Sequence, residues 1–221
     1  MSKQEISPSV IRRLPRYHRF LGELAAQGTI RISSKELSRQ MGLTASQIRQ
    51  DLNCFGGFGQ QGYGYNVCAL RDEIGQILGI NAHRKTILIG LGNLGRAIAS
   101  HVNFAQCGCD LIGLFDFNPF VAGRDIQGMQ VHHTDTLSGF CRQELPELAI
   151  LCVPENAAAE LANRLVSFGV RAFWNFSHSN LHFEDNSILV ENVHLADSLM
   201  TLTYGLSHDS SDEAAELCGD R

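Results

Sequence analysis

KTILIGLGNLGRAIASHV, residues 85–102, is the stretch that decides the fold of the second half of this chain. Its first six residues form a short apolar run that is typical of a buried strand. The strand leads into a helix through Gly90, Gly92 and Gly95, which have the spacing GxGxxG. Glycines in this context permit the tight turn, the approach of a pyrophosphate and the packing of helix on strand. The stretch therefore predicts a dinucleotide-binding turn, with further candidate contacts at Asn93 and Leu94.

An acidic residue follows at the distance that such a turn requires. A second strand, LIGLFD, ends at Asp116, 21 residues after Gly95. A carboxylate at this position binds the adenosine ribose hydroxyls and repels a 2′-phosphate. The sequence therefore predicts NAD(H) as the cofactor and disfavours NADP(H). A Rossmann-like sheet that binds no nucleotide is the open alternative.

The remaining second half continues the alternation of strands and helices. LAILCVP is a buried strand that ends at Pro154, NAAAELANRLVSFG is a helix that ends at Gly169, and VRAFWNFSHSN is the next strand and loop. This order predicts an α/β fold with a doubly wound parallel sheet and a ligand crevice at the carboxyl ends of its strands. Weaker candidates for contact with the cofactor lie at those ends: Asn118, Pro154, Glu155, Asn175, Phe176 and Ser177.

Charge is segregated between the two halves of the chain. Residues 1–85 contain 12 Lys or Arg and 6 Asp or Glu, while residues 86–221 contain 6 and 17, for a total net charge of −5. A basic segment on an acidic chain is typical of a module that binds a polyanion. A basic face that is merely solvated is the alternative.

The basic half begins with a helical pattern. Apolar residues recur every three or four positions between Pro8 and Gln27, which predicts either a helix with a kink at Pro15 or two successive helices. The polar face of this segment carries four arginines: Arg12, Arg13, Arg16 and Arg19.

A helix-turn-helix follows in TIRISSKELSRQMGLTASQIRQDLNCF, residues 29–55. Ser33 or Ser34 can cap its first helix and Gly42 can end it. Thr44 can start the second helix in capping-box spacing with a glutamine. Because Ile48 and Leu52 face inward, the outer face is left with amide, hydroxyl and cationic groups that suit the major groove of DNA: Ser46, Gln47, Arg49 and Gln50. An ordinary helical hairpin is the alternative.

A glycine- and aromatic-rich segment, FGGFGQQGYGYNV, comes next. Glycines permit positive φ angles and close backbone approach, so the segment suits a tight β-hairpin beside a recognition helix, as in a winged helix. A structural loop with stacked aromatic rings is the alternative interpretation.

The run SQIRQDLNCFGGFGQQGYGYNV resembles the recognition helix and wing of the Rex family of redox-sensing repressors, and the resemblance extends from about Val10 to Leu206. It continues in GLGNLGRA, FDFNP, VPENAA, WNFS and VENVHLADSLMTLTYGL. Two family cations are replaced, a helix lysine by Gln50 and a basic wing residue by Gln61. Fewer cations imply weaker non-specific DNA binding with a shallower salt dependence. The resemblance implies these DNA contacts: Arg12, Arg13, Ser46, Gln47, Arg49, Gln50, Gln61 and Tyr63.

The resemblance also implies a homodimer on a palindromic operator, with a C-terminal helix swapped between subunits. NAD+ is expected to be compatible with DNA binding, and NADH to favour a closed arrangement that disfavours it. The expected organisation is a winged-helix domain (1–80), a Rossmann NAD(H) domain (81–190), a swapped helix (191–207) and a disordered acidic tail (208–221). A relative with an altered or lost NADH response is the alternative.

The chain departs from the family at the residues implied in the switch. His101 replaces a tyrosine near the nicotinamide end, and His194 replaces an aspartate that pairs with an arginine at the position of Arg19. We expect Asp197, one helical turn further on, to take over this pairing. A pH-dependent response through the two histidines is a second alternative, and histidines that are merely packed or exposed are the third.

Other function classes are disfavoured by what the sequence lacks. No apolar run approaches the roughly 18 residues of a membrane helix, and the first ten residues lack a leader pattern, so we expect a cytoplasmic protein. The seven cysteines are interpreted as mostly buried, with no metal or redox role. An NAD-dependent dehydrogenase is disfavoured because His178 and His182 lack an evident carboxylate partner, so we expect no enzyme activity. A CoA-binding protein is the remaining rival.

Overall fold

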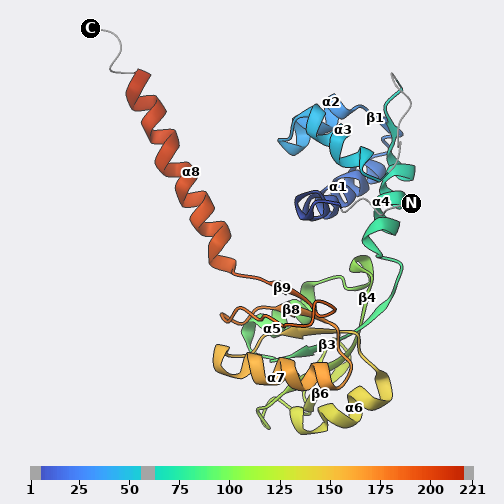
Figure 1. Cartoon of the computed structure of the whole chain (residues 1–221), viewed down its shortest axis with the longest axis vertical. Coiled ribbons are helices and arrows are strands. Elements are labelled where there is room, and N and C mark those ends of the chain that lie inside the picture. Colours follow the sequence, from blue (N-terminus) through green and yellow to red (C-terminus); the bar gives the residue numbers. More distant parts are fainter. Residues whose placement is uncertain (1–5, 56–62, 217–221) are drawn as a thin grey trace. The chain divides into compact units, whose positions relative to one another are not determined.

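The computed structural model describes residues 6–55 and 63–216, with side chains through residue 207. The chain forms two compact units, Met1–Ala82 and His83–Arg221 (Figure 1). Within the described ranges, no helix is both long and apolar enough to cross a membrane.

In the residues that the structure describes, the first unit has four helices and a small two-stranded sheet. Its elements are α1 (Pro8–Ala26), β1 (Arg31–Ile32), α2 (Ser34–Met41), α3 (Ala45–Asn53), β2 (Tyr65–Asn66) and α4 (Val67–Leu78). Strand β1 pairs antiparallel with β2. The core gathers one apolar face from each helix, with Leu14 and Leu21 of α1, Leu37 of α2, Ile48 of α3 and Ile74 of α4 all fully buried.

Helix α1 is continuous through Pro15, so the prediction of two successive helices is wrong. Pro15 is exposed, whereas Leu14, Tyr17 and Leu21 on the opposite face are fully buried. Burying an apolar side chain contributes about 1.5–3 kcal/mol, so three such contacts offset the roughly 3 kcal/mol that an internal proline costs.

The second unit is a sheet with helices on both faces. Its strands are β3 (Arg84–Ile89), β4 (Cys109–Asp116), β5 (Asp125–Ile126), β6 (Met129–His133), β7 (Leu148–Leu151), β8 (Ala172–Asn175) and β9 (Leu189–Asn192). Its helices are α5 (Asn93–His101), η1 (Ala105–Cys107), η2 (Thr134–Thr136), α6 (Leu137–Glu144), α7 (Glu155–Ser167) and α8 (Leu195–Glu216).

The strand order confirms the prediction of a doubly wound parallel sheet. In the described part of the chain, the seven strands run β5-β6-β4-β3-β7-β8-β9, and every pair is parallel except β5 with β6. Without the antiparallel edge strand β5, this is the order 3-2-1-4-5-6 of a dinucleotide-binding fold, whose order reverses beside β3. The crevice is therefore expected where β3 and β7 end.

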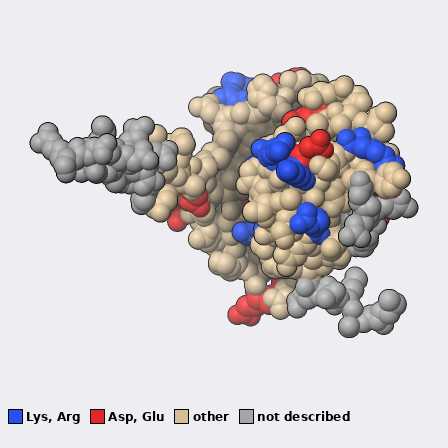
Figure 2. Space-filling view, turned by 90° about the horizontal axis from the view of Figure 1, so that it is seen from above, with Lys and Arg blue, Asp and Glu red and all other residues tan. Residues whose placement is uncertain are grey.

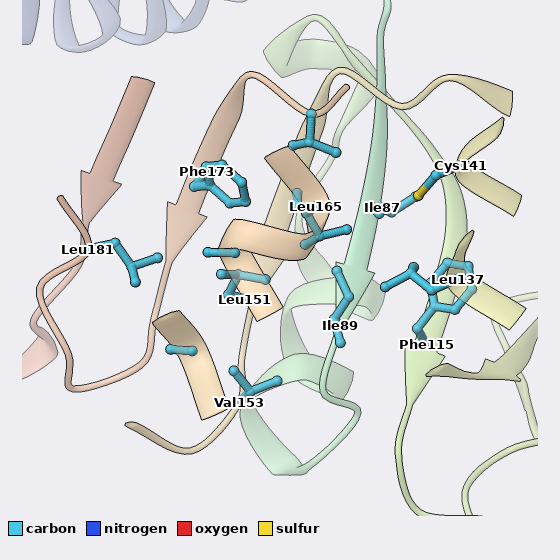
Figure 3. Packing of buried hydrophobic residues seen from close by; sticks show 14 of the residues in the cluster. Ile87, Ile89, Phe115, Leu137, Cys141, Leu151, Val153, Leu165, Phe173 and Leu181 are labelled. Atoms are coloured by element: carbon cyan, nitrogen blue, oxygen red, sulfur yellow. The ribbon is translucent and has the colours of Figure 1, made fainter. Parts of the chain in front are cut away.

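The central strands are apolar on both faces because helices cover both sides. Ile87, Ile89 and Phe115 face α6 and α7, where they pack against Leu137 and Leu165 (Figure 3). The alternate strand residues Leu88, Leu114 and Ile150 form a second core with Ile98 of α5. This double burial holds the strand ends, and therefore the candidate site, in place.

The C-terminal elements differ from the expected ones. Residues expected to open a helix at 191 instead end strand β9, which pairs with β8 through Trp174↔Glu191 and Asn175↔Asn192. Helix α8 begins at Leu195 and continues to Glu216, so most of the tail expected to be disordered is helical. Ala214, Ala215 and Glu216 are strong helix formers, and extending a helix is much easier than nucleating one. Residues 217–221 lie outside the described ranges.

Candidate nucleotide cleft and nucleic-acid interface

The three glycines after β3 have three different surroundings. A Cβ on Gly90, whose φ is +96°, would lie 2.4 Å from the Cys152 carbonyl oxygen. A Cβ on Gly95 would lie 1.8 Å from the Gly90 carbonyl oxygen. A Cβ on Gly92 would meet nothing within 4 Å. Packing therefore requires glycine at positions 90 and 95, while the space in front of Gly92 is open at the start of α5, where an anion is favoured by the helix N-terminus.

A cleft of about 460 Å³ lies at this turn, at the carboxyl ends of β3, β4, β7 and β8. Seven of the predicted cofactor residues line it: Gly90, Gly92, Leu94, Asp116, Asn118, Pro154 and Phe176. Arg96, Phe117, Val121 and Cys152 also line the cleft. The sequence interpretation missed these four. Phe117 and Cys152 directly follow β4 and β7, so their places at strand ends could have indicated them. Arg96 lies within α5 and Val121 in the loop after β4, where no such signal exists.

Three predicted cofactor residues do not line the cleft. The Asn93 side chain accepts a hydrogen bond from Arg96 (2.8 Å). Gly95 is a buried residue of α5 itself. Asn175 is fully buried, and its amide bonds to the protein itself. Of the weaker candidates, Ser177 is buried beside Asn175, and Glu155 is an exposed residue in the first turn of α7.

Asp116 connects two loops of the cleft. Its carboxylate is 4% exposed and accepts hydrogen bonds from the backbone N–H of Leu91 (2.6 Å) and of Asn118 (2.8 Å). Each carboxylate oxygen can accept a second bond, so ribose hydroxyls can still bind here. A 2′-phosphate would face this negative charge, so the geometry favours a dinucleotide without one.

The cleft offers little to acid–base or nucleophilic catalysis. Burial raises the pKa of Cys152 to about 12, which keeps this thiol protonated and unreactive at neutral pH. Within the residues that the structure describes, no carboxylate is hydrogen-bonded or ion-paired to His178, the histidine that lines the cleft. His182 does not line it.

The helix-turn-helix is held by the caps that the sequence indicates. The Ser33 hydroxyl accepts from the N–H of Glu36 and the Glu36 carboxylate accepts from the N–H of Ser33, while Gly42 ends α2 with a φ of 63°. Thr44 accepts from the backbone N–H of Gln47 (3.1 Å). The Gln47 side chain does not complete this second capping box, because its amide donates to Asp51 instead (2.8 Å).

A groove of about 900 Å³ runs along α3 and the start of α1. It contains all four predicted groove-reading residues, Ser46, Gln47, Arg49 and Gln50, and also Arg13. Ser46, Arg49 and Gln50 are exposed. Arg12 is exposed on α1 but does not line the groove. On the face shown in Figure 2, Lys and Arg form several separate groups, and Asp and Glu lie beside the central one.

Asp51 is the residue of this interface that the sequence interpretation missed. It is fully buried and accepts hydrogen bonds from the Arg13 guanidinium (2.6 and 2.8 Å), the Tyr17 hydroxyl (2.8 Å) and the Gln47 amide. Burial alone would raise the pKa of Asp51, but the hydrogen bonds from Arg13, Gln47 and Tyr17 outweigh it and lower this pKa. Two predicted DNA contacts, Arg13 and Gln47, are therefore held at the edge of the groove by one carboxylate.

The predicted wing is described only in part. Tyr63 is 70% exposed, and the Arg31 guanidinium lies 6.0 Å from its ring centre and donates to its carbonyl oxygen (3.2 Å). Strand β2 follows at Tyr65 and pairs with β1, which lies before α2. Gln61 lies in residues 56–62, outside the described ranges, so the glycine-rich hairpin stays a prediction.

The residues implied in the switch occupy four separate elements or loops. His101 is the last residue of α5, and Arg19 is exposed on α1. The His194 ring nitrogen Nε2 lies 2.8 Å from the Asn180 side-chain oxygen, and the backbone N–H of Asp197 donates to the His194 carbonyl (3.1 Å). The pairing of Arg19 with Asp197 joins the two units and stays a prediction.

The described cysteines are less buried than the sequence suggested. Cys141 is buried, but Cys54, Cys68 and Cys107 are exposed, and all the described cysteines are free thiols. Apolar neighbours in sequence do not ensure burial, because successive residues of a helix point to different faces. In the described residues no group of His, Cys, Asp and Glu is arranged to hold a metal.

Two family models match the chain. The model described as "Putative DNA-binding protein N-terminus" matches residues 5–53, and the model described as "CoA binding domain" matches residues 81–179. The first contains α1 to α3, and the second contains the glycine turn and the strands that surround the cleft.

Relatives resemble the chain along almost its whole length. It is 50% identical over 204 residues to the redox-sensing transcriptional repressor Rex of Clostridioides difficile (strain 630), covering 92% of this chain and 97% of the relative. It is 52% identical over 210 residues to the Rex of Caldanaerobacter subterraneus subsp. tengcongensis, covering 95% and 93%.

Solved structures are also similar to the chain along almost its whole length. The repressor RSP in complex with NAD+ and operator DNA is 47% identical, covers 97% of this chain and 99% of its own, and has a TM-score of 0.85. RSP in complex with NADH is 45% identical, covers 96% and 99%, and has a TM-score of 0.87. The similarity therefore spans both the groove along α3 and the cleft at the glycine turn.

Proposed function

Because this chain belongs to the Rex family of redox-sensing transcriptional repressors, we propose that it represses transcription by binding operator DNA in response to the NADH/NAD+ ratio. One observation carries the proposal. This chain has an open cleft at its glycine turn. It is also similar along nearly its whole length to a repressor whose structure is known in complex with NAD+ and operator DNA and in complex with NADH. The relatives are named as repressors, which confirms the prediction that the chain is not an enzyme.

NAD(H) binds in the cleft at the carboxyl ends of β3, β4, β7 and β8. The open space at Gly92 receives the pyrophosphate at the start of α5. Asp116 receives the adenosine ribose, and the residues that follow β7 and β8 receive the nicotinamide half, because this fold consists of two mononucleotide-binding halves. In the described residues the Cys152 thiol is protonated and His178 has no carboxylate partner, which suits binding of NAD(H) without turnover.

DNA binds along α3. The exposed residues Ser46, Arg49 and Gln50 face the major groove, while Arg13 and Gln47 contribute from positions set by Asp51. Tyr63 and Gln61 extend the contact from the wing, and Arg12 adds a cation beside the groove that α3 lines. The groove along α3 supports the positions on α3 and Arg13, and the resemblance to the family supports Arg12, Gln61 and Tyr63.

The chain acts as a homodimer through α8. Leu195, Leu199 and Leu202 are spaced to share one face of this helix, and they are 62%, 64% and 63% exposed in the single chain. A helix with such a face gains stability by burying it against a second copy. A two-fold pair of subunits places two α3 helices on two half-sites, which suits a palindromic operator. We propose that it works in the cytoplasm, since its ligands are DNA and NAD(H).

Electrophoretic mobility shifts on a palindromic operator test the function. We expect the protein to bind the operator with NAD+ present, and NADH to weaken this binding by about 5- to 150-fold, the usual range of coupling between two sites. CoA is the comparison ligand. An operator complex that persists at saturating NADH would contradict the proposed response, and a response to CoA alone would favour the rival ligand.

Lys in place of Gln50 should strengthen DNA binding. Gln50 is exposed in the groove of α3, at a position where the family resemblance implies lysine. One added phosphate contact should steepen the slope of log K against log salt concentration by about 0.9. Gln76→Lys, on the exposed side of α4, is the matched control and should leave the slope unchanged. If the two variants had the same slope of log K against log salt concentration, Gln50 would not lie at the DNA interface.

Asp197 should couple energetically to Arg19 in DNA binding. Histidine at position 194 lacks the permanent charge that an aspartate offers to arginine, whereas Asp197 lies in the first turn of the same helix, α8. A double-mutant cycle with Arg19→Ala and Asp197→Ala should show about 0.5–3 kcal/mol of coupling in operator affinity. Additive effects would exclude this pairing.

A further inference from the structure

Beyond the contacts proposed for NAD(H), we propose that Asn175 and Asn192 are positioning residues that couple the nicotinamide half of the cleft to the start of α8. The inference rests on the proposed function, since it concerns how the NADH response reaches α8. It begins from an unexpected location. Asn175, predicted to contact the cofactor, is 0% exposed and does not line the cleft.

The Asn175 side chain uses its full hydrogen-bonding capacity inside the protein. Its NH₂ group donates to the Ser179 carbonyl (2.7 Å) and to the Asn192 side-chain oxygen (2.8 Å). Its own oxygen accepts from the backbone N–H of Ser177 (3.1 Å) and from the Ser177 hydroxyl (2.7 Å). Two donors and two acceptor sites are all that an amide has, so its orientation is determined. The bonds hold the segment Ser177–Ser179 from one side.

Asn192 holds the far end of the same loop. Its side-chain oxygen also accepts from the backbone N–H of Leu181 (3.1 Å), and its NH₂ group donates to the Leu181 carbonyl (3.3 Å). Asn175 and Asn192 are register partners of β8 and β9, and the Val193 N–H donates to the Asn175 carbonyl (2.8 Å). A displacement of the loop therefore breaks bonds to the last residues of β9.

Both ends of this network are at functional positions. Phe176 and His178, which flank Ser177, line the cleft on the side of β8. At the other end, Asn192 is followed by His194, which contacts Asn180 of the loop, and by the first turn of α8. Asn175 and Ser177 are buried and Asn192 is half-buried. A satisfied network of this kind is rigid, because breaking one of its bonds inside the protein leaves a costly unpaired group. A displacement of the loop at the nicotinamide half of the cleft is thus transmitted to the N-terminus of α8.

Asn192→Ala is the test, in the full-length dimer with operator DNA. We expect its NADH affinity to stay within about 3-fold of wild type while the NADH effect on operator affinity falls from about 5- to 150-fold to under about 2-fold. Coupling is reciprocal, so operator DNA should also cease to weaken NADH binding. Asn163→Ala, an exposed asparagine of α7, is the matched control and should respond like wild type.

Asn180→Ala is a second test variant, in case Asn192→Ala fails to fold. Asn180 is exposed, and among the described residues its side chain contacts His194 alone, so this variant should fold normally and lose part of the coupling. Full coupling in both variants would overturn the inference. NADH affinity reduced by more than about 10-fold in Asn192→Ala would also overturn it, because the pair would then only shape the cleft. A wild type without any NADH response would overturn the proposed function itself.

Discussion

Alanine in place of Gly92 is expected to leave the protein folded and to weaken NADH binding by about 100-fold, or roughly 2.7 kcal/mol. The backbone at Gly92 has a φ of −64°, which any residue adopts, and a Cβ there meets no atom within 4 Å. The methyl group would occupy the space that the pyrophosphate needs at the N-terminus of α5. The added methyl group should therefore lower the affinity for NADH and leave the stability of the fold unchanged.

Two other glycines provide the comparison. Gly95→Ala should destabilise the whole second unit, since its Cβ would lie 1.8 Å from the Gly90 carbonyl oxygen. A Cβ on Gly139, in α6, meets nothing within 4 Å, so Gly139→Ala should leave NADH affinity unchanged and raise stability by up to about 1 kcal/mol through the better helix propensity of alanine. NADH titration by fluorescence, with thermal unfolding of each variant, separates the three cases. A Gly92→Ala protein with wild-type NADH affinity would show that no pyrophosphate binds at this turn.

Alanine in place of Asp51 is expected to destabilise the first unit by about 3–5 kcal/mol and to abolish operator binding. The change would leave the buried Tyr17 hydroxyl and the Arg13 guanidinium without their acceptor. It would also break the link between α1 and α3 on which the groove depends. This loss is a large fraction of the free energy of unfolding of a whole domain, which is about 5–15 kcal/mol.

Asp72→Ala is the matched control for this prediction. Asp72 pairs with Arg71 at 2.6 Å, but the two side chains are 59% and 35% exposed. Such a surface pair contributes less than about 1 kcal/mol. Amide hydrogen exchange in the full-length protein reports the outcome through protection of α1 and α3, and NADH binding should persist in both variants. Unchanged protection in Asp51→Ala would refute the role assigned to this carboxylate.

The Asp51 contribution should also depend on pH. Because the pKa of Asp51 is lowered in the folded protein, its contribution to stability is fully present above the ordinary value of about 3.9. The contribution is lost as the pH falls below that value towards the folded-state pKa. Asp51→Asn should lack this part of the acid dependence.

Sequence by itself determined the features that depend on residues close together in the chain. The strand before GxGxxG, the turn at Gly90 and the cap at Thr44 were predictable, and the first cap was predicted as Ser33 or Ser34. Each results from backbone geometry and hydrogen bonding within a few residues, and such local rules apply before the chain packs. The same holds for the alternation of strands and helices, which indicated a parallel sheet.

Tertiary structure alone decided which polar side chains became partners. Asp51 meets an arginine 38 residues earlier in the chain, and Asn175 meets an asparagine 17 residues later. A polar residue beside apolar ones can point to water or inward, and its own neighbours in sequence do not distinguish the two. Packing of distant elements decides, because an inward polar group is tolerated only where another element supplies its hydrogen bonds.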